Sequence, residues 1–401
     1  MFKSIMENGA DRESALNILE NFIDTKLHNY DSKRNYDLGP SKHDNVSQLS
    51  PYIRHRIITE EEVMTQAMSK FPLPKIEKFI QEVFWRTYWK AWLELRPRVW
   101  TDYKLLVEKS DKNQLYEKVI SLNTGIECFD AWTEELLQTN YLHNHARMWY
   151  ASIWIHTLKM PWYLGADLFL NNLLDGDPAS NTLSWRWVAG IQTKGKAYLA
   201  KDWNIEKFTK NRFNPKESDF SSIPAEMSFI DYKMNSIKFH ETREFAWDQS
   251  GLLITTEDMH VLSSDRINFP IQNAYILALT ATEKTNYSKN VSKFKHDISM
   301  SNMKLLSQHI SNIQMQSMDL DQIEQIVTWA KQNNIKNIVT LACPCGHVRD
   351  FINILKNELN KESIEIIKLY RDYDMKYWNL ASGSFFNFFN KAVKKISTMG
   401  K

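Results

Sequence analysis

The sequence contains few of the residues that interrupt regular structure. It has 11 glycines and 11 prolines in 401 residues, beside 14 tryptophans and 20 phenylalanines. This composition favours long helices over a β architecture rich in turns. Cysteine is scarcer still, and Cys128, Cys343 and Cys345 are too few for a disulfide framework. Such cysteine usage is typical of proteins in a reducing cytosol.

Two further features are missing. The N-terminus has no apolar segment of signal-peptide type, and no run of about 18 apolar residues predicts a membrane span. Charge of one sign is not in excess, since 50 Lys+Arg stand against 48 Asp+Glu. We therefore expect a cytoplasmic protein in which any nucleic-acid surface is a local patch.

The chain divides into two parts with different residue patterns. Up to about residue 215 the apolar residues recur at helical spacing, as in ESALNILENFIDTKL, without a convincing strand pattern. Thr59, followed by three glutamates, predicts the N-terminus of a helix. We predict a helical domain over residues 1–235, with a connector from residue 213 to about 250.

From Gly251 onward short apolar segments alternate with helical ones. GLLITTEDM, NAYILALTA, IKNIVTLA and IEIIKLY are typical of strands, whereas DLDQIEQIVTWAKQNN and DFINILKNELNKES are typical of helices. The alternation predicts a small parallel α/β domain over residues 246–401. No GxGxxG or Walker-type loop follows these strands, so an obvious nucleotide-binding fold is not expected. The segment 284–303, rich in Lys, Ser and Asn, predicts a solvated loop or a surface helix. The fold class is therefore multi-domain, α followed by α/β.

Four segments of the first part carry the strongest functional signal. In chain order they are VSQLSPYIRHR, QEVFWRTYW, NHARMWYASIW and LLDGDPASNTLSWRW. Together, in this order, they resemble the flavin-binding helical domain of the photolyase/cryptochrome family, over roughly residues 13–215. A set of four spaced motifs is far more specific than any one of them.

The resemblance implies FAD as the cofactor. Ser47 and Ser50 would offer donors to its diphosphate just before a helix. Asp175 would pair with Arg147 beside the flavin ring, and Asn181 would face the redox nitrogen of the ring. An amide at that place stabilises a reduced ring without adding charge. The implied cofactor contacts are Tyr30, Ser47, Gln48, Leu49, Ser50, Phe79, Arg86, Tyr141, Asn144, Arg147, Asp175, Asp177 and Asn181.

The resemblance also implies a pocket for a pyrimidine dimer extruded from DNA. Glu82 would donate to or protonate the pyrimidine edge, while indoles hold the dimer. Met148 favours cyclobutane dimers, because enzymes for the other major photoproduct usually carry histidine there. The implied substrate contacts are Glu82, Trp85, Asn144, Met148 and Trp187.

The implied catalytic residues are Glu82, Asn181, Trp185 and Trp162. Trp185 matches the member of the family's electron-transfer chain nearest the flavin, and Trp162 matches the middle member. The outer tryptophan is expected in residues 103–114, which hold none. Either Tyr103 substitutes for it or the chain exits elsewhere.

A DNA-facing rim should be basic, since phosphate contacts dominate affinity for nucleic acid. The candidates for this rim, on a protein expected to be a monomer, are Arg54, His55, Arg56, Arg186, Lys194 and Lys196.

The second part weakly resembles the antenna domain that precedes the flavin domain in ordinary photolyases. Here the similar segments follow it, and the identity of an antenna chromophore, folate or deazaflavin, is not readable. Cys343, Cys345 and His347 lie too close together for a usual zinc site, so no metal is expected.

The resemblance implies a deoxyribodipyrimidine photolyase, an FAD-dependent lyase that repairs cyclobutane pyrimidine dimers in DNA with blue or near-ultraviolet light. The alternative is a cryptochrome-like photoreceptor, which would bind FAD and signal without repair. A third alternative is a flavin-binding remnant whose partner is unknown.

Overall fold

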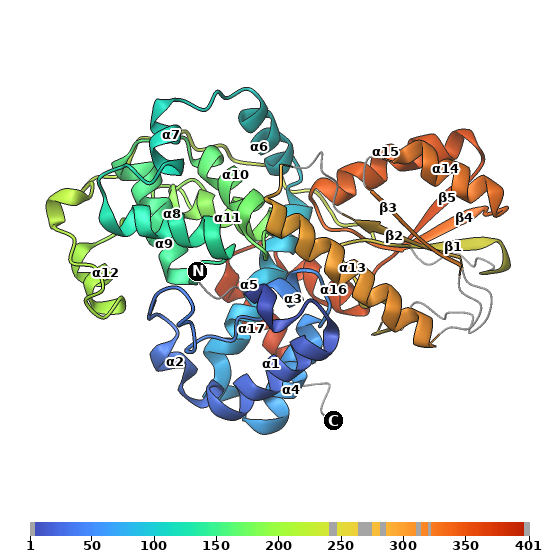
Figure 1. The fold of residues 1–401 in the computed structure, drawn as a ribbon, viewed down its shortest axis with the longest axis horizontal. Coiled ribbons are helices and arrows are strands. Elements are labelled where there is room, and N and C mark those ends of the chain that lie inside the picture. The colour runs from blue at the N-terminus through green and yellow to red at the C-terminus, as the bar shows by residue number, and fades with distance from the viewer. Residues whose placement is uncertain are drawn as a thin grey trace.

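A computed structural model describes residues 5–239, 247–263, 275–280, 286–309, 314–319 and 322–396. The first half of the chain is helical, and no strand occurs within residues 5–239. Its helices occupy the left and lower parts of Figure 1. They are α1 (Arg12–Thr25), α2 (Tyr30–Lys33), α3 (Ser50–Arg54), α4 (Glu60–Lys70), α5 (Leu73–Leu95), α6 (Arg98–Glu108), α7 (Gln114–Ile120), α8 (Glu127–Thr139), α9 (Asn144–Ser152), α10 (Trp162–Asn172), α11 (Pro178–Val188) and α12 (Asp202–Phe208).

Local capping explains where two of these helices begin. The predicted N-cap Thr59 accepts a hydrogen bond from the Glu62 N–H, and the Glu62 side chain accepts one from the Thr59 N–H in return. At α11, Asp177 caps the helix and Pro178 occupies its first turn, where a missing N–H costs nothing. Only the start at Thr59 was predicted from the sequence, although both depend on short segments.

The second half contains a parallel sheet of five strands. They are β1 (Ser250–Ile254), β2 (Tyr275–Thr280), β3 (Gln314–Asp319), β4 (Asn337–Leu341) and β5 (Glu365–Leu369), in the spatial order β3-β2-β1-β4-β5. Strand β3 was missed, because QMQSMD lacks the β-branched and aromatic residues that identify strands. The sheet therefore extends from β1 in both directions.

Helices cover both faces of this sheet. Leu253 of β1 packs in a cluster with α14 (Ile323–Gln332) and α15 (His347–Lys361), which lie on one face in Figure 1. Its neighbours Leu252 and Ile254 point the other way, into the cluster that contains α13 (Lys289–His309). Most of the segment 284–303, predicted as a solvated loop or a surface helix, forms part of helix α13. This helix buries Val291, Phe294 and Ile298.

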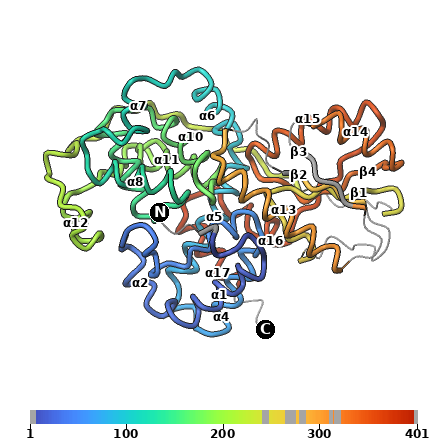
Figure 2. The backbone as a smooth tube through the Cα atoms, in the orientation of Figure 1, coloured from blue at the N-terminus to red at the C-terminus, as the bar shows by residue number. Residues whose placement is uncertain are grey.

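The end of the chain returns to the helical half. Helices α16 (Asp372–Tyr377) and α17 (Phe385–Ile396) both contact α5, and the tube in Figure 2 shows this late segment among early ones. One buried cluster includes residues from both halves. Residues 213–239 of the predicted connector are irregular apart from one short turn of helix. The domain division at residues 235 and 246 stays a prediction.

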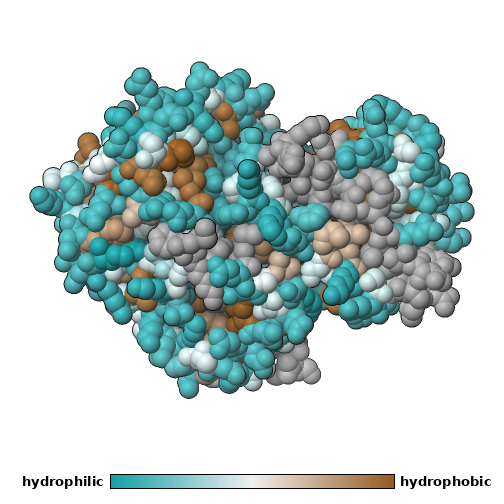
Figure 3. Space-filling view, in the orientation of Figure 1, coloured by the Kyte–Doolittle hydropathy of each residue, from teal (hydrophilic) through white to brown (hydrophobic). Residues whose placement is uncertain are grey.

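The outer surface in Figure 3 is mostly hydrophilic, with its larger hydrophobic patches over the helical half. Among the described residues, no helix combines the length and apolar character that crossing a membrane requires.

Candidate functional site

A cavity of about 630 Å³ opens among the helices of the first half. Its volume lies within the usual range for small-molecule sites, about 300–1,000 Å³. Every residue predicted to bind cofactor or substrate lines it, together with Trp185, whereas Trp162 does not. These lining residues are Tyr30, Ser47, Gln48, Leu49, Ser50, Phe79, Glu82, Trp85, Arg86, Tyr141, Asn144, Arg147, Met148, Asp175, Asp177, Asn181, Trp185 and Trp187.

Two carboxylates stand in the turn between α10 and α11. Asp175 accepts a hydrogen bond from Arg147 at 3.0 Å, which confirms the predicted contact. Asp177 accepts one from the Ser180 N–H at 2.7 Å. Burial alone would raise the pKa of both, but Arg147 lowers that of Asp175, and Lys90 with Arg54 lowers that of Asp177. Both side chains therefore remain ionised at neutral pH.

Asn181 lies one turn into α11 and is 9% exposed. Its amide nitrogen donates to the Ala166 carbonyl at 2.7 Å. Because that carbonyl belongs to α10, the amide is held between two helices. The orientation of Asn181 in the cavity wall is thus fixed by the backbone, and its proposed role toward a flavin stays a prediction.

Glu82 has a partner that sequence reasoning missed. Arg34 donates to the Glu82 carboxylate at 2.7 Å and also lines the cavity. Burial raises the pKa of Glu82, while Arg34 and then Lys78 partly offset that rise. The pair joins the loop after α2 to α5, positions 48 residues apart. No local pattern around Arg34 indicates this contact.

Both indoles predicted to hold the substrate already have an aromatic neighbour. Trp85 stacks on Phe385 of α17, with ring centroids 3.6 Å apart and planes within 7°. Trp187 stacks on Tyr198 at 5.6 Å. One face of Trp85 is therefore covered by a residue from the far end of the chain.

Of the two predicted electron-transfer tryptophans, Trp185 is part of this wall and Trp162 is not. Trp185 is 2% exposed, and its indole fills the space beside Gly165, where an added Cβ would lie 2.3 Å from the ring. The ring centroids of Tyr103 and Trp162 are 5.9 Å apart, and those of Trp100 and Tyr103 are 5.3 Å apart. Tyr103 thus neighbours the middle residue of the predicted chain, and its role in electron transfer stays a prediction.

The prediction of a basic rim is wrong for four of its six residues. Arg54, His55, Arg56 and Arg186 are 1%, 1%, 3% and 5% exposed. The first three meet the α/β half, where Glu257, Asp258 and Asp374 supply carboxylates and Thr256 a carbonyl. These partners lie about 200 or more positions away, so a local charge cluster resembled solvated surface.

Arg186 instead bonds Gln192 and the Ile191 carbonyl within its own segment. Lys194 and Lys196 are exposed and remain candidates.

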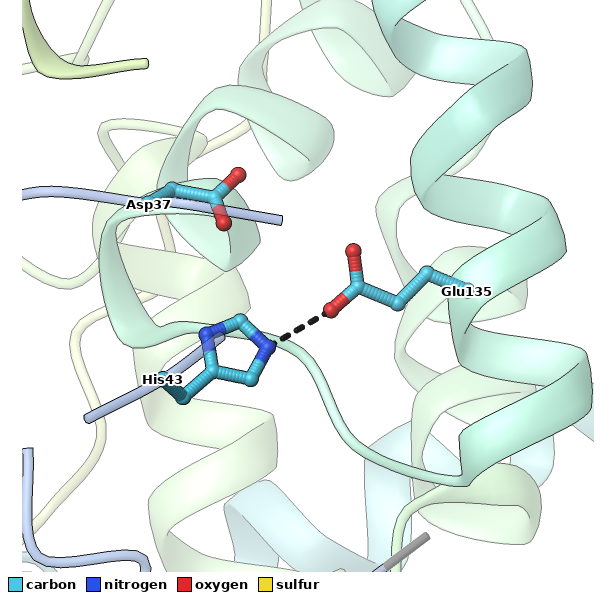
Figure 4. Close-up of side chains that lie close together, drawn as sticks. All are labelled: Asp37, His43 and Glu135. Atoms are coloured by element: carbon cyan, nitrogen blue, oxygen red, sulfur yellow. Dashed lines mark hydrogen bonds and ion pairs between the residues drawn. The ribbon is translucent and has the colours of Figure 1, made fainter. Parts of the chain in front are cut away.

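Asp37, His43 and Glu135 form a buried cluster that sequence reasoning did not detect. Figure 4 shows the three side chains facing one another, with the His43 ring joined to Glu135. Their potential ligand atoms lie within 4.8 Å of one another. His43 bonds Glu135 at 2.8 Å, and the Asp37 carboxylate accepts from Trp132 and from Arg212. Because Arg212 already compensates the charge of Asp37, we assign no metal to the cluster. Its ring contact with Tyr141, at 5.1 Å, places it behind the cavity wall.

Comparison with known proteins identifies this architecture. Residues 79–218 match the model of the FAD binding domain of DNA photolyase. Over this segment the helical half resembles the photolyase/cryptochrome family. The matched range includes the greater part of α5 and all of α9 and α11, which together carry most of the cavity wall.

Curated photolyases are similar to part of the chain. A deoxyribodipyrimidine photo-lyase of Streptomyces griseus is 35% identical over 153 residues, covering 37% of this chain and 33% of that protein. One from Agrobacterium fabrum is 32% identical over 183 residues, covering 44% and 37%. The crystal structure of a class III photolyase from Agrobacterium tumefaciens covers 50% of this chain and 43% of that one, at 28% identity and a TM-score of 0.43. The chain spans less than half the length of these relatives.

FAD is the cofactor of this photolyase domain, and the cavity residues fit it. Within the part of the chain that the structure describes, four buried polar atoms of the lining have no hydrogen-bond partner: Nε of Arg34, Nη1 of Arg86, Oδ1 of Asp175 and Oγ of Ser180. A guanidinium and a hydroxyl are suitable donors for a diphosphate. Ser180 lies in the first turn of α11, and Arg86 lies on the neighbouring helix α5. The residues present can therefore hold the phosphate part of the cofactor.

Proposed function

We propose that this protein repairs cyclobutane pyrimidine dimers in DNA in a light-driven reaction. The observation that carries the proposal is one cavity lined both by the predicted flavin contacts and by Glu82, Trp85, Asn144, Met148 and Trp187. Bound, reduced FAD would supply the photoexcited electron that opens the cyclobutane ring. The protein itself supplies position, exclusion of water and a proton-donating group.

Glu82 is suited to the substrate side of this cavity. Because burial raises its pKa, its carboxyl group holds a proton more readily than an exposed glutamate does. Arg34 fixes the carboxyl group in place through a 2.7 Å hydrogen bond. In its protonated form Glu82 can donate a hydrogen bond to a pyrimidine carbonyl, with Trp85 and Trp187 providing apolar rings beside it.

The first test uses the purified, FAD-loaded and chemically reduced protein with a short DNA that carries one thymine cyclobutane dimer. We expect blue light to restore thymine absorbance, with no recovery in the dark. Glu82→Ala should lower the rate of recovery by about 10²-fold, the lower end of the range for a proton-transfer group, without altering the flavin absorption spectrum. A protein that holds reduced FAD but gives no recovery would contradict the proposal.

The alternative is a photoreceptor that binds FAD and signals without repair. The stacking of Phe385 on Trp85 at 3.6 Å favours it, because a covered indole face is lost to a substrate. Phe385→Ala separates the two functions. If the protein is a repair enzyme, removing the Phe385 ring should free the Trp85 face and tighten its binding of dimer-containing DNA. If it is a photoreceptor, binding of that DNA should be equally weak in the wild type and in Phe385→Ala.

A further inference from the structure

The α/β half presents the carboxyl ends of its central strands to the helical half. In an open parallel sheet, the chain can add strands on both sides of the first one. The loops that follow the two adjacent strands where the direction changes then run apart, and the crevice between them is a usual ligand site. Here those loops follow β1 and β4. Arg54 of α3 enters there and bonds the Glu257 carboxylate through two hydrogen bonds of 2.7 Å each.

The same guanidinium reaches the cavity wall on its other side. Its Nε donates to the Gly176 carbonyl at 2.9 Å and lies 3.6 Å from the Asp177 carboxylate. Gly176 and Asp177 both line the cavity. Glu257, which is 5% exposed, is therefore separated from the cavity wall by one side chain.

We propose that Glu257 is a positioning residue of the flavin site, acting through Arg54, so that the α/β half sets the affinity and the reduction potential of the cofactor. This inference rests on the proposed flavin-dependent function. The bidentate contact fixes the guanidinium where it holds the Gly176–Asp177 turn. The Glu257 carboxylate also offsets the positive charge of Arg54, which would otherwise act in full on Asp177.

Charge balance gives the direction of the effect. Asp177 lies between Arg54 and Lys90, whose ammonium is 4.0 Å away. Replacing Glu257 by glutamine removes one negative charge from this buried group and leaves Arg54 and Lys90 with only the Asp177 carboxylate between them. Added positive charge favours the more negative, reduced form of a flavin, so its reduction potential should become more positive.

A second ion pair between the halves provides a matched control. Glu94 of α5 bonds Arg349 of α15 at 2.7 and 2.5 Å, and Glu94 does not line the cavity. Glu257→Gln and Glu94→Gln each remove one carboxylate from the contact between the halves. Effects that the two variants share therefore report on that contact, and effects of Glu257→Gln alone report on the flavin site.

The experiment measures the flavin reduction potential by dye-equilibrated titration, and the FAD dissociation constant by fluorescence, for the full chain and both variants. We expect a more positive potential and an altered dissociation constant for Glu257→Gln, with both values at wild-type level for Glu94→Gln. If Glu257→Gln does not fold, Arg54→Lys keeps the charge but loses the bidentate contact. That variant should weaken FAD binding while the potential stays within error.

Two results would overturn the inference in distinguishable ways. A wild-type chain that retains no FAD would overturn the proposed function and this inference with it. A wild-type chain that binds FAD, with equal potentials and affinities in Glu257→Gln and Glu94→Gln, would overturn the inference alone.

Discussion

The cavity wall and the contact between the two halves are both buried and charged, yet they are built differently. At the contact, Arg56 bonds Glu60, Asp258 and Asp374 at 2.6–3.1 Å. In the wall, Arg86 Nη1 has no hydrogen-bond partner among the described residues, and burial raises the pKa of Glu82. At the contact the Arg56 guanidinium is fully paired with carboxylates of the chain, whereas the wall keeps a guanidinium donor of Arg86 available for a ligand.

The two regions also differ in what limits substitution. The contact depends on the pairing of charges, because each unpaired buried ion is costly. The apolar side of the wall depends on close packing, since Trp185 lies against a glycine with no space for a further carbon atom. Charge substitutions should therefore be most damaging at the contact, and changes of volume at the wall.

Arg56→Ala is expected to have the largest effect on folding. It removes the cation shared by three buried carboxylates, and removing one partner of a buried ion pair costs about 3–5 kcal/mol. Chemical denaturation would measure this loss as a change in the free energy of unfolding. The control Lys331→Ala removes an exposed pair with Glu362 and should cost about 0–1 kcal/mol. Equal losses in the two variants would break the comparison.

Gly165→Ala should have an intermediate effect that is confined to the wall. Its Cβ would lie 2.3 Å from Trp185 and 2.9 Å from Trp154, so the indoles must shift at a cost of about 1–3 kcal/mol. Tryptophan fluorescence and denaturation would record the change. In Gly383→Ala the new Cβ meets the flexible end of Asn387 at 3.1 Å, and a smaller loss is expected. A fully tolerated Gly165→Ala would mean that the wall is not closely packed.

Glu82→Gln should have the smallest effect on folding and should reveal opposite pH behaviour in the two regions. Because the pKa of Glu82 is raised, its ionised form costs stability at neutral pH. The wild type should gain stability relative to Glu82→Gln, by less than about 1 kcal/mol, as pH falls from 7 through that raised pKa. Urea denaturation of both proteins between pH 7 and 4 would measure this gain, and a difference independent of pH would contradict it.

The carboxylates of the contact should behave in the opposite way. Burial would raise the pKa of Asp258, but Arg371 and Arg56 hold it below its usual value. Its contribution is therefore complete above the unfolded pKa of about 4 and is lost as pH falls toward the lower folded value. Stability of the wild type should accordingly decline below about pH 4 despite the small gain from Glu82.

Local features of the sequence determined a large part of this protein. The capping box of Thr59, the cap formed by Asp177 and the alternation of β4, α15 and β5 each depend on residues within a few positions of one another. The composition of the cavity wall was predicted through the family resemblance of four spaced motifs, which carry most of its lining. Strand β3 was not, because its polar sequence lacks strand propensity and pairing with β2 stabilises it.

Tertiary structure alone decided the environment of the remaining groups. Arg54 and Arg56 were predicted to be exposed. They are buried, and carboxylates 203 and 318 positions away neutralise their charges. Phe385 covers Trp85 because α17 returns to α5. Glu135 meets His43 and Asp37 across 92 positions of sequence or more. Propensity and capping act over one or two turns of chain. Burial and charge pairing act through space, so the sequence specifies the groups and the fold specifies their partners.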